Sequence, residues 1–172
     1  NRIIVTDPSF SSVYAKVGAN NGSGVPGNGS GAGFNNPKGV YGLGNTFYVA
    51  DSGNNQIQKY VWKSGVPYYQ TAYKFSDSTI TGLNQSLNDP RGIFTTSFNS
   101  NNFFFISDYG NHRVLCGIET NNKIQVFQIL GNNSAGLGIS NTSLISYAPY
   151  SSVVGTGVGF TFYNTLNRSE EH

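Results

Sequence analysis

The chain has 172 residues, a formal net charge of +2 at pH 7, and only 10% charged residues. This length is enough for one well-buried domain and does not require two. So few basic residues make nucleic acid a poor partner, because affinity grows with each phosphate that is neutralised. No apolar run approaches the roughly 20 residues of a membrane-spanning helix. The 22 glycines and 14% aromatic residues favour short strands joined by tight turns.

Short apolar and aromatic segments predict strands along the whole chain, with no convincing helical period. A first pair precedes a glycine- and serine-rich loop, two groups of four follow, and a second loop of the same kind precedes a final pair. The predicted strands are residues 2–6, 12–18, 40–43, 46–50, 56–62, 69–75, 92–96, 103–107, 113–118, 123–130, 151–154 and 159–163. The predicted turns inside the two groups of four include residues 63–67 and 119–122.

Two motifs each occur twice, in the same order. Asn-Pro-Lys-Gly-Val at residues 36–40 returns as Asp-Pro-Arg-Gly-Ile at 89–93, and Ala-Asp-Ser-Gly-Asn at 50–54 returns as Ser-Asp-Tyr-Gly-Asn at 107–111. A column of equivalent residues runs through both copies and both ends of the chain, and consists of Arg2, Gln56, Arg113 and Arg168. A period of a few tens of residues indicates a repeat architecture such as a solenoid or propeller.

These motifs resemble the NHL repeat, which reads roughly Pro-x-Gly-Val and then Tyr-Val-Ala-Asp-Ser-Gly-Asn-x-Arg-Ile. Residues 47–57 and 106–114 carry the two clear matches. The resemblance implies a β-propeller with blades of four antiparallel strands, and such propellers often have six blades. This chain departs from the family because its units are longer and too few to close a ring.

The expected fold is therefore all-β, a propeller-like array of four-stranded antiparallel blades with about three blades' worth of strands. Residues 1–172 form one segment of this kind. Its parts are the second half of a blade at 1–18, whole blades at 37–75 and 90–130, and the first half of a blade at 149–168. The final hairpin of one copy could pair with the first strands of the next, which would close a ring of two copies or build a filament. The alternative is a piece of a longer polypeptide that closes its own ring.

Four residues of the repeated turns are expected to be structural: Asp51, Gly53, Asp108 and Gly110. An aspartate can accept hydrogen bonds from backbone amides two residues on, and glycine tolerates positive φ. Because both copies carry the acid, a turn-stabilising role explains it better than catalysis does.

No catalytic residue, cofactor or metal site is expected. His112 and His172 are the only histidines, whereas zinc sites normally draw on several histidines or cysteines. The single cysteine, Cys116, is expected in the core. Tyr109, at a hairpin tip, and Arg113 are the candidate contact residues.

Six Asn-x-Ser/Thr sequences are candidate N-glycosylation sites, at Asn21, Asn28, Asn84, Asn132, Asn141 and Asn167. Five of the six fall in predicted loops between blades, where a glycan can be accommodated. The sequence therefore favours a non-enzymatic extracellular or cell-surface scaffold that contacts other copies of itself or another protein. Two other hypotheses remain: a fragment of a lyase- or lactonase-type propeller enzyme with its metal ligands outside this chain, and an RNA-binding propeller, which the low charge disfavours.

Overall fold

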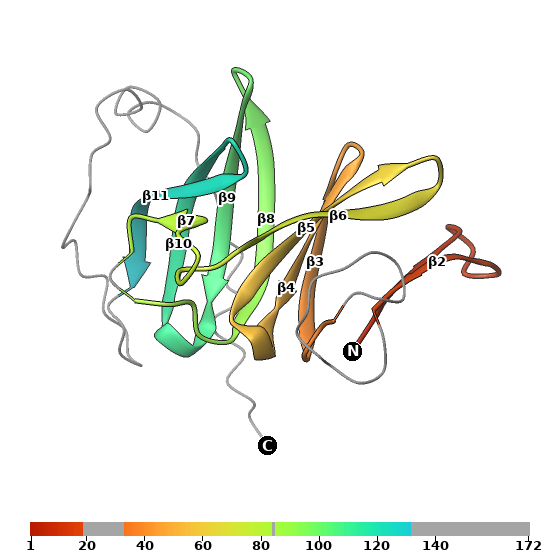
Figure 1. Ribbon diagram of the computed structural model, residues 1–172, viewed down its shortest axis with the longest axis horizontal. Helices are drawn as coiled ribbons and strands as arrows, with labels where there is room; N and C mark the ends of the chain where they lie inside the picture. Colours follow the sequence, from red (N-terminus) through yellow and green to blue (C-terminus); the bar gives the residue numbers. More distant parts are fainter. Residues whose placement is uncertain (19–32, 84, 132–172) are drawn as a thin grey trace.

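The computed structural model of the chain describes residues 1–18, 33–83 and 85–131, which form three sheets standing side by side (Figure 1). The strands are β1 (Ile3–Thr6), β2 (Val13–Val17), β3 (Pro37–Leu43), β4 (Thr46–Asp51), β5 (Gln56–Lys63), β6 (Val66–Tyr73), β7 (Ile80–Thr81), β8 (Pro90–Phe98), β9 (Asn101–Asp108), β10 (Arg113–Thr120) and β11 (Lys123–Gly131). Two short 3-10 helices, η2 (Ser52–Asn54) and η3 (Tyr109–Asn111), follow β4 and β9. No other helix occurs in these three ranges.

Two sheets are antiparallel blades of the predicted kind. The first blade has the strand order β3-β4-β5-β6. The second blade has the equivalent order β8-β9-β10-β11. The register repeats as well, since Pro37 lies opposite Asp51 and Pro90 lies opposite Asp108, each followed by a β-bulge. The all-β, propeller-like fold predicted from the sequence is therefore confirmed. Residues 149–168, the expected half blade, lie outside the described residues.

Two hairpin turns are shorter than predicted. Residues 63–67 were expected to form a loop, but the turn contains only Ser64 and Gly65, both with positive φ (50° and 77°). Asn121 and Asn122, with φ of 53° and 56°, make the corresponding turn of the second blade. Two residues with positive φ match the twist of antiparallel strands, so the strands continue to the turn itself.

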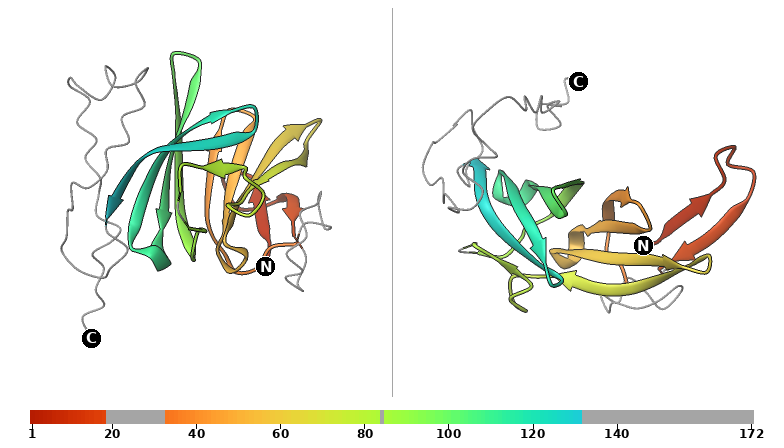
Figure 2. Two further views of the ribbon diagram at one scale, coloured as in Figure 1. Left: turned by 60° about the vertical axis from the view of Figure 1, so that its left-hand side comes forward. Right: turned by 90° about the horizontal axis from the view of Figure 1, so that it is seen from above.

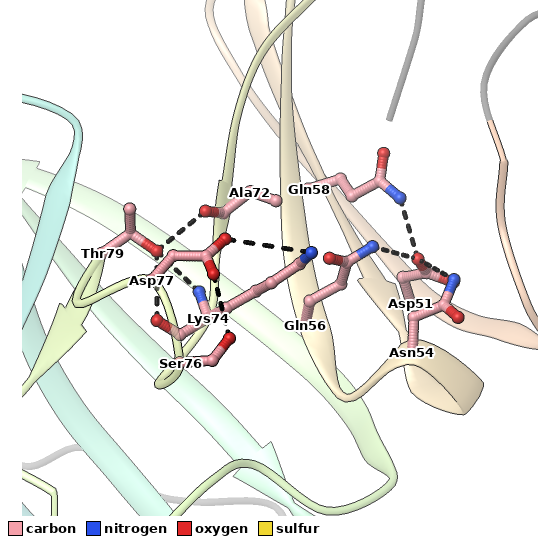
Figure 3. A network of polar contacts seen from close by, with 9 residues as sticks. All are labelled: Asp51, Asn54, Gln56, Gln58, Ala72, Lys74, Ser76, Asp77 and Thr79. Atoms are coloured by element: carbon pink, nitrogen blue, oxygen red, sulfur yellow. Dashed lines mark hydrogen bonds and ion pairs between the residues drawn. The ribbon is translucent and has the colours of Figure 1, made fainter. Parts of the chain in front are cut away.

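The second blade has a fifth strand that the sequence analysis missed. Strand β7 pairs in parallel with β11, Ile80 lying opposite Ile124. The chain before it is held by Thr79, whose hydroxyl donates to the carbonyl of Ala72 at 2.9 Å and accepts from the amide of Lys74 at 2.7 Å (Figure 3). The connection between the blades is thus an ordered turn that adds an edge strand.

The larger apolar core lies between the two blades. From the first blade Tyr48 and Tyr73 point into it, and from the second Phe104 meets the ring of Tyr48 edge-on with 5.0 Å between centroids. The other buried members of this cluster are Ala50, Ile57, Ile80, Leu87, Ile93, Ile106, Leu115, Ile124 and Val126. Each large apolar side chain buried here contributes about 1.5–3 kcal/mol, so this contact fixes the two blades against each other.

A second, smaller core covers the opposite face of the first blade. Its buried members are Val17, Phe34, Phe47, Val49 and Tyr60, with Ile3 packed against them. The β1–β2 hairpin therefore lies beside the first blade, on the side away from the second blade (Figures 1 and 2). In the described ranges, no helix is both long and apolar enough to cross a membrane.

Candidate functional site

The most elaborate polar arrangement of the first blade centres on Asp51, at the end of β4. One carboxylate oxygen, Oδ1, accepts a hydrogen bond from the backbone amide of Asn35 at 2.7 Å. The other, Oδ2, accepts from the side-chain amides of Asn54, Gln56 and Gln58 at 2.6–2.8 Å (Figure 3). The buried carboxylate therefore joins the loop before β3 to the turn and strand after β4.

Asp108 has the same role in the second blade. Its Oδ1 accepts from the amide of Asn88 at 2.7 Å, and its Oδ2 accepts from Asn111 Nδ2 at 2.9 Å and from Arg113 Nε at 2.7 Å. We call each arrangement an Asp clamp, after its central residue. The aspartates were expected to bond amides two residues on, but neither 3-10 helix has a side-chain cap. Instead, each carboxylate reaches an amide 16 or 20 residues earlier in the chain.

Gly53 and Gly110 belong to the clamps for a reason that differs from the prediction. Positive φ occurs at Asn55 and His112, not at these glycines. A Cβ atom on Gly53 or Gly110 would lie 2.6 Å from the side-chain amide of Asn35 or Asn88. That asparagine donates to the glycine carbonyl at 3.2 Å, and its own carbonyl accepts from the glycine amide at 2.8 Å. Glycine is therefore required by the close approach of the preceding loop.

Arg113 does not lie at a contact surface, so that expectation is wrong. Its side chain is 1% exposed because it forms the ion pair with Asp108 inside the Asp clamp. Tyr109, the other candidate, is 43% exposed, and the guanidinium of Arg91 lies 3.3 Å from its ring centroid. Arg91 is in turn paired with Asp89 at 2.8 Å. The side chain of Tyr109 is thus held on the surface by Arg91, which belongs to the other repeated motif, at residues 89–93.

A buried carboxylate that the sequence analysis did not single out links the two blades. Glu119, near the end of β10, accepts from Lys59 Nζ at 2.5 Å and from the hydroxyl of Tyr73. Tyr48 and Asn102 also donate to it, each at 3.4 Å. Burial, reinforced by the carboxylate charge, raises the pKa of Tyr48 and Tyr73 above the usual tyrosine range. Sequence spacing gave no signal for this cluster, because Glu119 was assigned to a turn.

The β1–β2 sheet is joined to the β3–β6 blade in the same way as the β3–β6 blade is joined to the β8–β11 blade. The side chain of Asn55 accepts a hydrogen bond from the amide of Asp89 at 2.9 Å. One repeat earlier, the side chain of Asn1 accepts from the amide of Asn36 at 2.7 Å. The register also corresponds, since Ile3 lies opposite Val17 as Ile57 lies opposite Tyr73. Strands β1 and β2 are therefore the structural equivalents of β5 and β6.

The remaining candidates carry no reactive arrangement in the part of the chain that the structure describes. No group of three or more histidine, cysteine, aspartate or glutamate residues there could hold a metal ion. His112 is an exposed residue with φ of 50° at the end of η3. Cys116 is buried. All six candidate glycosylation sites lie outside the described residues.

The fold and its clamps define a class of protein, an array of β-propeller-type blades, and both four-stranded blades of the described residues are closed by a buried aspartate. Within that class, the family model of the NHL repeat matches residues 34–60, which include β3, β4, the first Asp clamp and much of β5. NHL repeats commonly mediate contacts between proteins, so the match indicates a propeller-type interaction scaffold. A comparison with curated proteins gave no match for the chain.

Proposed function

We propose that this chain is a non-enzymatic, extracellular structural or interaction scaffold of NHL-type blades that assembles with other copies through a split blade. The observation that carries the proposal is the equivalence of β1–β2 to β5–β6. In the described ranges β1 pairs with β2 alone, whereas β5 lies between β4 and β6. Sheet edges are normally covered or paired, and in the proposed assembly a second copy adds strands beside β1.

The buried acids support a scaffold better than they support an enzyme. Asp51 and Asp108 each accept hydrogen bonds on both carboxylate oxygens. Glu119 accepts hydrogen bonds from the ammonium group of Lys59 and the hydroxyl of Tyr73, both in the other blade. A general acid or base needs an atom that can reach a substrate. These carboxylates instead hold loops and blades together.

The decisive experiment is the native mass of the purified chain, measured by light scattering together with negative-stain imaging. Two copies would supply six blades and give a ring, while a contact that does not close would give a filament. Either result supports assembly through the split blade. A compact monomer of 18.5 kDa at all concentrations would contradict it.

The extracellular part of the proposal rests on the six Asn-x-Ser/Thr sequences. We expect the chain, when secreted from eukaryotic cells, to lose mass on treatment with an N-glycosidase. The deamidation that this enzyme leaves at each released asparagine would identify the occupied positions by mass spectrometry. A secreted chain with the unmodified mass would remove the support that these sequences give.

A further inference from the structure

The inference concerns the first Asp clamp, which is held by neutral groups where the second clamp contains a cation. Asp108 forms an ion pair with Arg113. Asp51 is just as deeply buried, but it accepts hydrogen bonds only from neutral amides. No lysine or arginine of the described ranges forms an ion pair with it. Because a buried charge is normally paired with an opposite one, a cationic group is expected close to this clamp.

One atom of Gln56 indicates where that group would bind. The side chain is fully buried, and its Nε2 donates to Asp51 at 2.6 Å, while its Oε1 has no hydrogen-bond partner. Only one other buried side-chain atom of the described residues, Thr95 Oγ1, is in the same state. Buried acceptors are nearly always satisfied in native proteins, because leaving one unpaired is costly. Figure 3 shows Oε1 on the side of the amide that faces Lys74 rather than Asp51.

The strand register places Lys74 next to Gln56. In the antiparallel pair of β5 and β6, Ile57 lies opposite Tyr73. The residues one step further, Gln56 and Lys74, are therefore opposite each other, with side chains on the same face of the sheet. The Lys74 ammonium lies 3.9 Å from Asp77 Oδ2, and these two side chains are 31% and 54% exposed. That distance is too long for a hydrogen bond, and an ammonium group has three N–H donors, so Lys74 can also serve Gln56.

The same two positions in the other sheets show a complementary choice of residues. Arg113 lies opposite Gly131 in the second blade. Arg2 and Gly18 occupy the equivalent positions of the β1–β2 sheet, one step beyond its printed strand pairs. Both glycines have positive φ, 103° and 106°, and a Cβ on either would lie 3.0 Å from the Cα of the arginine opposite. In the first blade, glutamine replaces the arginine and Lys74 replaces the glycine. Each sheet therefore has one cationic residue at this pair of positions, on one strand or on its neighbour.

We propose that Lys74 is the cationic partner of the first Asp clamp. Its ammonium group donates to Gln56 Oε1, which gives a chain of hydrogen bonds from Lys74 through Gln56 to the carboxylate of Asp51. The backbone of Lys74 is bonded to the hydroxyl of Thr79, in the connection that leads to β7. Lys74 thereby fastens the connection between the blades to the clamp of the first blade. This role concerns a single copy of the chain and is independent of the proposed assembly.

The first test removes the ammonium group. Lys74→Met keeps an apolar side chain, and we expect it to raise the equilibrium constant of unfolding, measured by urea denaturation, at least tenfold. The matched control is Asp77→Asn, which removes only the exposed ion pair with Lys74. It should change the constant less than threefold, because exposed pairs are weak. The effect of Lys74→Met should persist in about 1 M NaCl, which screens exposed charges. Equal effects of the two substitutions, or a Lys74→Met effect that disappears in salt, would overturn the proposal.

The second test moves the charge to the strand that carries it in the second blade. In the Lys74→Met background, Gln56→Arg should lower the equilibrium constant of unfolding at least fivefold, because an ion pair like that of the second clamp then forms with Asp51. In the parent it should give no such gain, since two cations would compete for one carboxylate. The same effect in both backgrounds would contradict the role of Lys74. If Gln56→Arg folds in neither background, the comparison of Lys74→Met with Asp77→Asn still decides the proposal.

Discussion

Arg113 Nε donates to Asp108 Oδ2 at 2.7 Å, and the two side chains are 1% and 0% exposed. At the equivalent place in the first blade, a neutral side chain, Gln56, donates to Asp51 Oδ2 at 2.6 Å. One Asp clamp is thus an ion pair, and the other is held by amides alone. The geometry of the clamp tolerates either donor because both reach the same carboxylate oxygen from five residues further along the chain.

This relationship predicts different costs for two substitutions at Arg113. Removing one partner of a buried ion pair typically costs 3–5 kcal/mol, because the other charge stays buried without compensation. Arg113→Ala should therefore lower the free energy of unfolding by about that amount. Arg113→Gln should cost clearly less, since Gln56 shows that a side-chain amide can donate to the equivalent carboxylate, Asp51. Urea denaturation, monitored by circular dichroism, measures the free energy of unfolding of both variants.

The control for this prediction is Arg91→Ala. Arg91 pairs with Asp89 at 2.8 Å, but its side chain is 42% exposed, and exposed pairs contribute about 0–1 kcal/mol. If Arg113→Ala were as mild as Arg91→Ala, the Asp108 clamp would have no part in stability.

The close approach at the clamp glycines predicts that they do not tolerate a methyl group. Gly53→Ala places a Cβ 2.6 Å from the side-chain amide of Asn35, and forcing such a contact typically costs about 1–3 kcal/mol. Gly42→Ala is the control, because its Cβ would have nothing nearer than the Thr46 carbonyl oxygen at 3.9 Å. Thermal unfolding should show a lower midpoint for Gly53→Ala and little change for Gly42→Ala. Equal midpoints would mean that the preceding loop gives way without cost.

The tyrosines around Glu119 predict a loss of stability at alkaline pH. Burial and the Glu119 charge raise the pKa of Tyr48 and Tyr73 above that of an unfolded tyrosine, about 10. The folded protein therefore holds these protons more tightly than the unfolded chain does. The stabilisation is fully present below about pH 10 and is lost as the pH rises from there towards the folded pKa.

Urea denaturation at pH 8 and at pH 10.5–11 measures this effect. Tyr73→Phe should cost roughly 1–3 kcal/mol at pH 8, because Glu119 loses a buried donor, and it should reduce the further loss at high pH. Tyr14→Phe, at an exposed tyrosine, is the control. If the free energy of unfolding fell equally with pH in the parent and in Tyr73→Phe, the raised pKa of Tyr73 would not be a cause of the alkaline loss of stability.

Cys116 is predicted to be an unreactive thiol in the folded protein. It is buried, and burial raises the pKa of its thiol to about 11, so little thiolate forms at pH 8. A chromogenic disulfide reagent at pH 8 should label it only after denaturation. Val66→Cys adds an exposed cysteine as the positive control. Fast labelling of Cys116 in the native parent would contradict its place in the core.

Local patterns were sufficient for every described strand except β7, and for the position of the two repeated turns that carry Asp51 and Asp108. Alternating apolar residues and tight-turn residues specify a hairpin over a few neighbours in the chain, and the repeat of Asp51 as Asp108 showed that the two blades correspond. The resemblance to the NHL repeat implied a blade of four antiparallel strands, and the short connections between neighbouring strands are the physical reason for the order β3-β4-β5-β6.

Contacts between distant parts of the chain were decided only by the folded structure. Glu119 lies in a segment predicted as a turn, and its donors Lys59 and Tyr73 come 60 and 46 residues earlier. Strand β7 has two residues, too few for a periodic signal, and exists because β11 offers an edge to Ile80. Gly53 is required by Asn35, and Val40 is exposed because no described strand covers it. A pattern read along the chain reports local conformation, whereas burial and polar partners depend on which surfaces meet in space.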